Sequence, residues 1–269
     1  MIKPYLAEAF NQVPHSANEI HGDKVAKDYG FKGGLVPGVT VSAYLCQPAV
    51  EAWGKEWLDR GRAHVQVVSP LYDGEQFEVK ISEAGADSYH AQLVRPDGTV
   101  SARAEVTMAV AAEPAPQYRG DAIMTRDFKA PLALPENMAK LQAEGCLACK
   151  ARWSREHDMH TYFRDQAAMP ELLKIDGPAW ANDAFILGTS NWILAGNAYM
   201  NPWVHMETTH QHYEAIPLNT DLVAEMTVED CFNKKGHEFV DAKVALYDLN
   251  DHRCYAVIDL RAIYKLRGL

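Results

Sequence analysis

The sequence predicts an α+β fold in which one structural unit occurs twice, each unit being an antiparallel sheet wrapped around a long central helix. Two long, largely apolar helices are expected at residues 38–58 and 178–199, and strands with an alternating apolar pattern follow each of them. The tight turns of the two halves also correspond, because Gly85 of the first half aligns with Gly236 of the second. A buried helix wrapped by a sheet, present twice in one chain, is the tandem (double) hotdog architecture.

Each central helix is expected to be buried. Residues 38–58 are apolar on nearly every side of the helical wheel, which indicates burial rather than one surface-facing side. Pro48 removes one backbone hydrogen bond within this helix, so the sequence predicts a kink there. Residues 178–199 are apolar on most faces, and Pro178 suits a position in the first turn.

The strands are predicted from residues that alternate between apolar and polar. The dipeptide Asp97-Gly98, preceded by proline, is a strong hairpin signal between two of them. The expected strands of the first half lie near residues 63–67, 77–81, 88–95 and 99–110, and those of the second near 204–213, 222–232, 237–247 and 254–266.

The expected boundaries follow from these elements. Residues 1–112 form the predicted N-terminal unit, 135–269 the C-terminal unit, and 113–134 a linker. Alanine and proline around 111–117 give the start of this linker the composition of extended chain. Two units in one chain reproduce the dimer that single hotdog units form, and we expect such chains to associate further into a homodimer.

Composition excludes several classes of partner. The chain has 26 Lys and Arg against 36 Asp and Glu, a net charge of −10, which argues against a nucleic-acid surface. A run of about 18 apolar residues, as a membrane span needs, is absent, and the N-terminus lacks the apolar core of a secretory signal. Five cysteines, an odd number, fit a reducing compartment, so we expect a cytoplasmic protein without membrane or nucleic-acid partners.

The segment before the first central helix carries a recognisable motif. Residues 18–23 read Asn-Glu-Ile-His-Gly-Asp, and the glycine-rich stretch 29–39 ends at the expected start of that helix. This pattern resembles the hydratase-2 motif of the MaoC-like hotdog family, which includes R-specific enoyl-CoA hydratases. Residues 201–205 and 235–241 look like parts of the C-terminal half of double-hotdog members.

The resemblance implies addition or removal of water across a 2-enoyl thioester of coenzyme A. In that family an Asp and a His activate water, an Asn helps to hold them, and the glycine N–H at the helix start polarises the thioester carbonyl. Asn18, His21 and Gly38 match the Asn, the His and the glycine, and Val36 and Pro37 are expected to contact the substrate.

The motif departs from the family pattern at three positions. Ser16 stands where the family has Asp, Glu19 where it has Pro, and Pro37 where it has His. A serine hydroxyl is no general base near neutral pH, so Ser16 is expected to contribute only a hydrogen bond. His21 alone could take the proton from water, because the ordinary pKa of histidine is about 6.5.

Two other functions remain compatible with the sequence. A hotdog acyl-CoA thioesterase would use Asp183, near the start of the second helix, or Glu238 to activate water. Asp183 could instead contribute to a helix cap, and His237 could lie at the mouth of a substrate cleft or on a solvated hairpin. The third possibility is a protein that binds an acyl thioester without turning it over.

No metal site or cofactor is expected, and coenzyme A enters only as part of the substrate. Cys146 and Cys149 form a single CxxC pair, whereas a structural zinc site needs a second pair of ligands. On a regular strand His210 and His212 share one face and His205 points the other way. That arrangement favours a polar sheet face over a metal centre.

Overall fold

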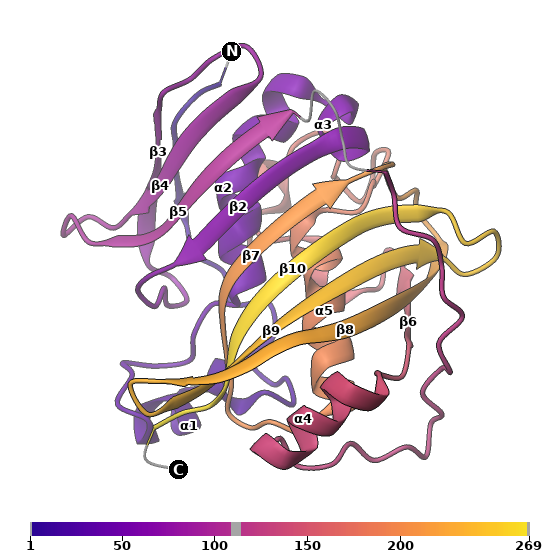
Figure 1. Ribbon diagram of the computed structural model, residues 1–269. Helices are drawn as coiled ribbons and strands as arrows, with labels where there is room; N and C mark the ends of the chain where they lie inside the picture. Colours follow the sequence, from indigo (N-terminus) through magenta and orange to yellow (C-terminus); the bar gives the residue numbers. More distant parts are fainter. Residues whose placement is uncertain (1, 109–113, 268–269) are drawn as a thin grey trace.

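A computed structural model describes residues 2–108 and 114–267, and Figure 1 shows their strands forming one continuous, strongly twisted sheet. Neighbouring strands are antiparallel throughout, in the order β1-β3-β4-β5-β2-β7-β10-β9-β8-β6. The first five strands in this order come from the first half of the chain and the last five from the second. Their orders are equivalent about the β2–β7 junction, so the predicted duplicated α+β fold is confirmed.

The strands agree with the expected positions apart from two that were not predicted, β1 and β6. These are the two edge strands of the sheet, and each is too short to give a clear alternating pattern. The first half contributes β1 Tyr5–Glu8, β2 Gly61–Val67, β3 Gln76–Ser82, β4 Ser88–Val94 and β5 Val100–Met108. The second half contributes β6 Cys149–Trp153, β7 Val204–His212, β8 Thr220–Lys234, β9 His237–Asp248 and β10 Cys254–Lys265.

The first central helix was predicted as one helix over residues 38–58, but the structure divides it in two. The longer part is α2 (Gly38–Trp53), and a separate short helix, α3 (Lys55–Arg60), follows it. The helix continues through Pro48 without interruption, and the break falls at Gly54, whose φ is 62°. Glycine adopts this left-handed conformation readily because it has no Cβ.

The second central helix, α5 (Asp183–Asn197), begins later than the predicted residue 178. Asn182 caps it, since its Oδ1 accepts a hydrogen bond of 3.0 Å from the backbone N–H of Phe185. The other helices are α1 Asp23–Asp28, α4 Pro135–Glu144 and the 3₁₀-helices η1 Glu19–His21, η2 Asp158–His160 and η3 Gln166–Ala168. Within the described ranges, none of the helices is both long enough and apolar enough for a membrane span.

The core lies between the sheet and the two central helices. Every residue of α2 from Val39 to Val50 is buried, which confirms the prediction made from its apolar wheel. The helix is covered on one side by β2, β4 and β5 and on another by α5. Figure 1 shows α2 and α5 together on one face of the sheet.

The two halves join through β2 and β7, which pair edge to edge from Arg62 with Gln211 to Gln66 with Glu207. This pairing makes the two five-stranded halves one sheet. The two units therefore share hydrogen bonds along their junction as well as side-chain contacts.

A β-bulge in β7 overturns the predicted orientation of His205. In the ladder between β7 and β10, Arg261 pairs with Glu207 and the next residue, Ala262, pairs with His205. Met206 is therefore an extra residue, and the alternation of β7 shifts by one at that point. As a result His205 joins the buried face that also holds Thr208, His210 and His212.

The segment 114–134 lies along the second half. The carboxylate of the buried Glu225 accepts hydrogen bonds from the backbone N–H groups of Arg119, Gly120 and Asp121, at 2.7–2.8 Å. The segment also pairs with the second half through bridges from Ile123 and Leu132. The predicted boundary between residues 112 and 113 lies outside the described residues, as do the first residues of the alanine- and proline-rich stretch.

Candidate functional site

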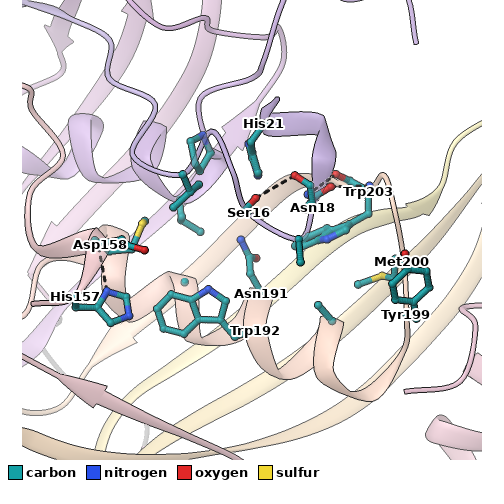
Figure 2. Close-up of a pocket in the computed structure, with 17 residues that line it drawn as sticks. Ser16, Asn18, His21, His157, Asp158, Asn191, Trp192, Tyr199, Met200 and Trp203 are labelled. Atoms are coloured by element: carbon teal, nitrogen blue, oxygen red, sulfur yellow. Dashed lines mark hydrogen bonds between the residues drawn. The ribbon is translucent and has the colours of Figure 1, made fainter. Parts of the chain in front are cut away.

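A cavity of about 390 Å³ lies where η1 and the start of α2 face α5 and η2, so both halves of the chain contribute to it (Figure 2). Its size is within the range of small-molecule pockets. The apolar part of the wall includes Val13, Val39, Met159, Trp192, Ala195, Tyr199, Met200 and Trp203. The polar part includes Ser16, Asn18, His21, Asp158 and Asn191.

His21, at the end of η1, is held in one tautomer. Its Nδ1 lies 2.7 Å from the carbonyl oxygen of Leu35, which can only accept a hydrogen bond, so Nδ1 carries the proton. Nε2 then has a free lone pair, and no residue in the described part of the chain bonds to it. Burial lowers the pKa of His21, and the hydrogen bond to Leu35 opposes this only in part. The imidazole is therefore neutral near pH 7 and able to accept a proton.

The glycine-rich stretch places the Leu35 carbonyl next to this histidine. A Cβ on Gly34 would lie 2.1 Å from the backbone oxygen of His21, so only glycine permits this approach. Asp23 accepts a hydrogen bond of 2.9 Å from the Gly34 N–H, and Leu35 N–H donates to the Ile20 carbonyl. Asp23 thus fixes the turn and does not contact His21 through any hydrogen bond in the described residues.

Asn18 joins the two halves of the chain at the cavity wall. Its Nδ2 donates to the carbonyl oxygen of Trp203 at 3.0 Å, and its Oδ1 accepts from the Trp203 N–H at 3.2 Å. Ser16 Oγ donates to the backbone oxygen of Asn18 at 3.0 Å. Figure 2 shows these contacts next to His21. The residues predicted from the motif therefore lie together, with Asn18 engaged by the opposite half.

Gly38 and Val36 line a smaller cavity of about 40 Å³ beside the main one, whereas Pro37 lines the main cavity. His21 and Asn18 contribute to both cavities. Gly38 is the first residue of α2, where the backbone N–H groups carry the positive end of the helix dipole. A Cβ on Gly38 would lie 2.8 Å from the ring of His205, so a side chain at this position would displace that histidine.

His205 and Asn191 are site residues that the sequence analysis did not identify. The Nδ1 of His205 lies 3.0 Å from Asn191 Oδ1, and its Nε2 contacts the hydroxyl of Thr208. Burial lowers the pKa of His205 to about 4, with a smaller contribution from His21, so the ring is neutral. A proton on Nδ1 satisfies both contacts, because the Thr208 hydroxyl then donates to Nε2.

This network orients Asn191 toward the cavity. With its Oδ1 bound to His205, its amide group NH₂ has no hydrogen-bond acceptor among the described residues. Figure 2 shows the Asn191 side chain rising from α5 toward Ser16 and Asn18. An amide donor is thereby available to a bound molecule. Only the bulge in β7, which the sequence pattern did not reveal, places His205 where it can do this.

Asp158 supplies a carboxylate from the second half. It lies in η2, is exposed at the residue level and lines the main cavity. It is the one acidic residue of the cavity wall in the part of the chain that the structure describes. Its negative charge acts on the neighbouring His157, whose pKa it raises against the larger lowering by burial.

Asp183, Glu238 and His237, which the sequence also offered as site residues, do not line the main cavity. Asp183 is buried, with its carboxylate 2.9 Å from His212 Nε2 and 3.3 Å from Trp57 Nε1. His237 begins β9 directly after a tight turn, and its Nδ1 accepts a hydrogen bond from the Arg267 N–H. Asp183 and His237 thus form hydrogen bonds with residues that are distant from them in the sequence.

Neither a family model nor a curated protein matches this sequence. Solved structures do match. Rv0216 of Mycobacterium tuberculosis, described as having a double hotdog fold, has a TM-score of 0.56 at 10% identity, covering 98% of this chain and 96% of its own. A MaoC-like dehydratase has a TM-score of 0.54 at 10% identity, covering 99% of this chain and 98% of its own.

A third match is the tesB protein of Mycobacterium avium subspecies paratuberculosis, with a TM-score of 0.52 at 11% identity, covering 98% of this chain and 93% of its own. Identities this low establish a shared fold and leave the activity to the site. The chain is a double-hotdog protein.

Proposed function

We propose that the protein is an acyl-thioester hydro-lyase of the MaoC-like type, which adds water to a 2-enoyl-CoA or removes it from the product. The observation that carries this proposal is His21, which lines a largely apolar cavity and whose neutral imidazole has a free Nε2. The shared fold with a MaoC-like dehydratase supports it.

In the hydration direction His21 acts as the general base. Its Nε2 takes a proton from water while the water oxygen bonds to C3 of the enoyl group, and the electron pair of the double bond moves onto the thioester as an enolate. The imidazolium of His21 then gives a proton to C2, which restores the neutral histidine.

In this proposal two groups donate to the enolate oxygen, which would lie where the main and the smaller cavity adjoin at Asn191. Gly38 N–H lies at the N-terminus of α2, where the helix dipole favours developing negative charge. The Asn191 amide, turned toward the cavity by His205, is the second. The acyl chain would contact apolar residues of the wall such as Trp192, Met200 and Trp203.

The thioesterase alternative requires a carboxylate that activates water against the thioester carbonyl. Neither Asp183 nor Glu238 belongs to the cavity wall, so in this cavity Asp158 would have to take that role. A thioesterase II structure from Thermobifida fusca shares the fold, which keeps thioester hydrolysis among the outcomes to be measured.

The test is a mass-spectrometric time course with short and medium 2-enoyl-CoA substrates and the matching saturated acyl-CoAs. A hydro-lyase adds one water to the enoyl substrates and leaves the saturated ones unchanged. Release of free coenzyme A from both sets would overturn the proposal in favour of a thioesterase. Binding of the panel without turnover would instead identify an acyl-thioester binding protein.

A further inference from the structure

A second cluster of reactive side chains lies apart from the cavity, where α2, α5 and β7 meet. It consists of Cys46, Asp183, His210 and His212, all buried, and none of them lines the main cavity. The ligand atoms of Cys46, Asp183 and His210 all lie within 4.8 Å of one another. His212 Nε2 is 2.9 Å from Asp183 Oδ1.

The hydrogen-bonding capacity of this cluster is incomplete. The side chain of His210 has no exposed surface, yet neither of its ring nitrogens has a hydrogen-bond partner among the described residues. Its Nε2 lies 3.9 Å from Asp183 Oδ1, too far for a hydrogen bond. Buried polar atoms are nearly always bonded, so the unpartnered Nε2 of His210 indicates a missing ligand.

We propose that this cluster is a structural metal site, with Cys46 Sγ, a carboxylate oxygen of Asp183 and His210 Nε2 as ligands. His212 Nε2, which is 2.9 Å from Asp183 Oδ1, would exchange that hydrogen bond for the fourth position on the ion. A thiolate, a carboxylate and two imidazoles are the donor types that Zn²⁺ prefers in tetrahedral sites. The charges also fit, because one thiolate and one carboxylate together neutralise a divalent ion. The proposal is independent of the hydro-lyase activity.

The surroundings hold the proposed ligands in place. Trp57 Nε1–H donates to Asp183 Oδ2 at 3.3 Å, and its ring lies edge-on to His210 and His212, with centroids 6.2 and 5.6 Å apart. Such outer contacts orient metal ligands and raise affinity. The ligands come from both halves of the chain, so a bound ion would link α2 of the first half to α5 and β7 of the second.

The experiment is to produce the full chain in medium supplied with zinc or with cobalt, since a site this buried is filled during folding. We expect about one zinc ion per chain by elemental analysis after removal of weakly bound metal. The cobalt protein is expected to show tetrahedral d–d bands and a thiolate-to-cobalt charge-transfer band. Absence of metal from the wild-type protein in both media would overturn the proposal.

Variants distinguish the site from adventitious binding. Cys46→Ser is expected to abolish the charge-transfer band, whereas the matched variant Cys254→Ser, which changes a buried cysteine outside the cluster, leaves it unchanged. His210→Gln is expected to lose the ion, and Trp57→Phe to weaken affinity by about 10–100-fold through loss of the outer contact. A charge-transfer band that survives in Cys46→Ser, or zinc retained at wild-type level in His210→Gln, would contradict the assignment.

Discussion

The proposed chemistry depends on one hydrogen bond, from His21 Nδ1 to the Leu35 carbonyl, which leaves Nε2 free as a base. The motif predicted the histidine, and the structure adds the reason for its protonation state. Gly34 makes the contact possible, because any side chain there would collide with the backbone of His21. Gly34 therefore helps to set the protonation state of His21, because it lets the backbone bring the Leu35 carbonyl to the ring.

The variant His21→Ala removes the proposed base. We expect kcat/KM for enoyl-CoA hydration to fall by about 10²–10⁴, the usual contribution of a general base, with the fold unchanged by circular dichroism. His90→Ala, at a histidine on β4 outside the main cavity, is the control and should retain full activity. Unchanged turnover in His21→Ala would remove this residue from the mechanism.

The pH dependence of the reaction should reflect the environment of His21. Burial lowers its pKa, and the base works only when deprotonated. Activity should therefore persist below the ordinary histidine pKa of about 6.5 and decline only as the pH falls through the lowered value. The measurement is kcat/KM of the free enzyme across the acidic range. An acidic limb centred at or above about 6.5 would contradict it.

Asp158, in η2 of the other half, is the acidic residue of the cavity wall in the described part of the chain. Asp158→Asn keeps the size of the side chain and removes its charge. Because the proposed hydro-lyase assigns both proton transfers to His21, we expect kcat/KM for enoyl-CoA hydration to change by less than about tenfold. Glu156→Gln, a nearby acidic residue outside the cavity wall, is the matched control. A loss of turnover in Asp158→Asn but not in Glu156→Gln would contradict this assignment and make the Asp158 carboxylate part of the mechanism.

At the scale of elements, the join between α3 and β2 depends on a close approach. A Cβ on Gly61 would lie 2.2 Å from the indole ring of Trp57, which is fully buried. Gly61→Ala must displace this ring, and overpacking of this kind costs about 1–3 kcal/mol in the free energy of unfolding. Gly85→Ala, where the nearest atom would be 3.5 Å away, is the control in urea unfolding. Equal urea midpoints for Gly61→Ala and Gly85→Ala would contradict this prediction and show that the Trp57 ring can move aside without loss of stability.

The bulge in β7 shows where reasoning from alternation stops. Regular alternation along β7 would place His205 and His210 on different faces of the sheet. Because Met206 is an extra residue, both side chains lie on the same, buried face. A bulge is set by how the neighbouring strand pairs, in this case β10, more than fifty residues away in sequence. The position of His205, and with it the orientation of Asn191, could not be derived from the local sequence.

At the scale of the whole molecule, Glu207 lies at the junction of the two halves. Its Oε1 is 2.6 Å from His64 Nε2 on β2 and accepts from Gln66 at 3.1 Å. Partial burial raises the pKa of Glu207, but the hydrogen bonds from His64 and Gln66 and the charges of His64 and Arg261 outweigh it. The pKa of this carboxyl therefore lies below its usual range.

This shift predicts how the junction responds to acid. A carboxyl with a lowered folded-state pKa stabilises the protein above its unfolded-state pKa of about 4.3 and loses that contribution as the pH falls through the folded-state value. Glu207→Gln should thus be less stable at pH 7 by under about 1 kcal/mol, given its partial exposure. In urea titrations the difference should stay nearly constant down to about pH 4.3 and shrink as the pH falls further. A stability difference between wild type and Glu207→Gln that grows as the pH falls would contradict the prediction.

The sequence by itself determined the duplicated double-hotdog fold, both buried helices and the grouping of Ser16, Asn18 and His21, because these follow from local periodicity, turns and a contiguous motif. Only the tertiary structure decided which side chains join His21 at the main cavity and which form the buried cluster around Cys46. Asp158 and Asn191 join His21 from the other half, and Asp183 joins Cys46 and His210 in the interior. The physical reason is that such contacts are made by strand pairing and helix packing between distant segments, which no local pattern records.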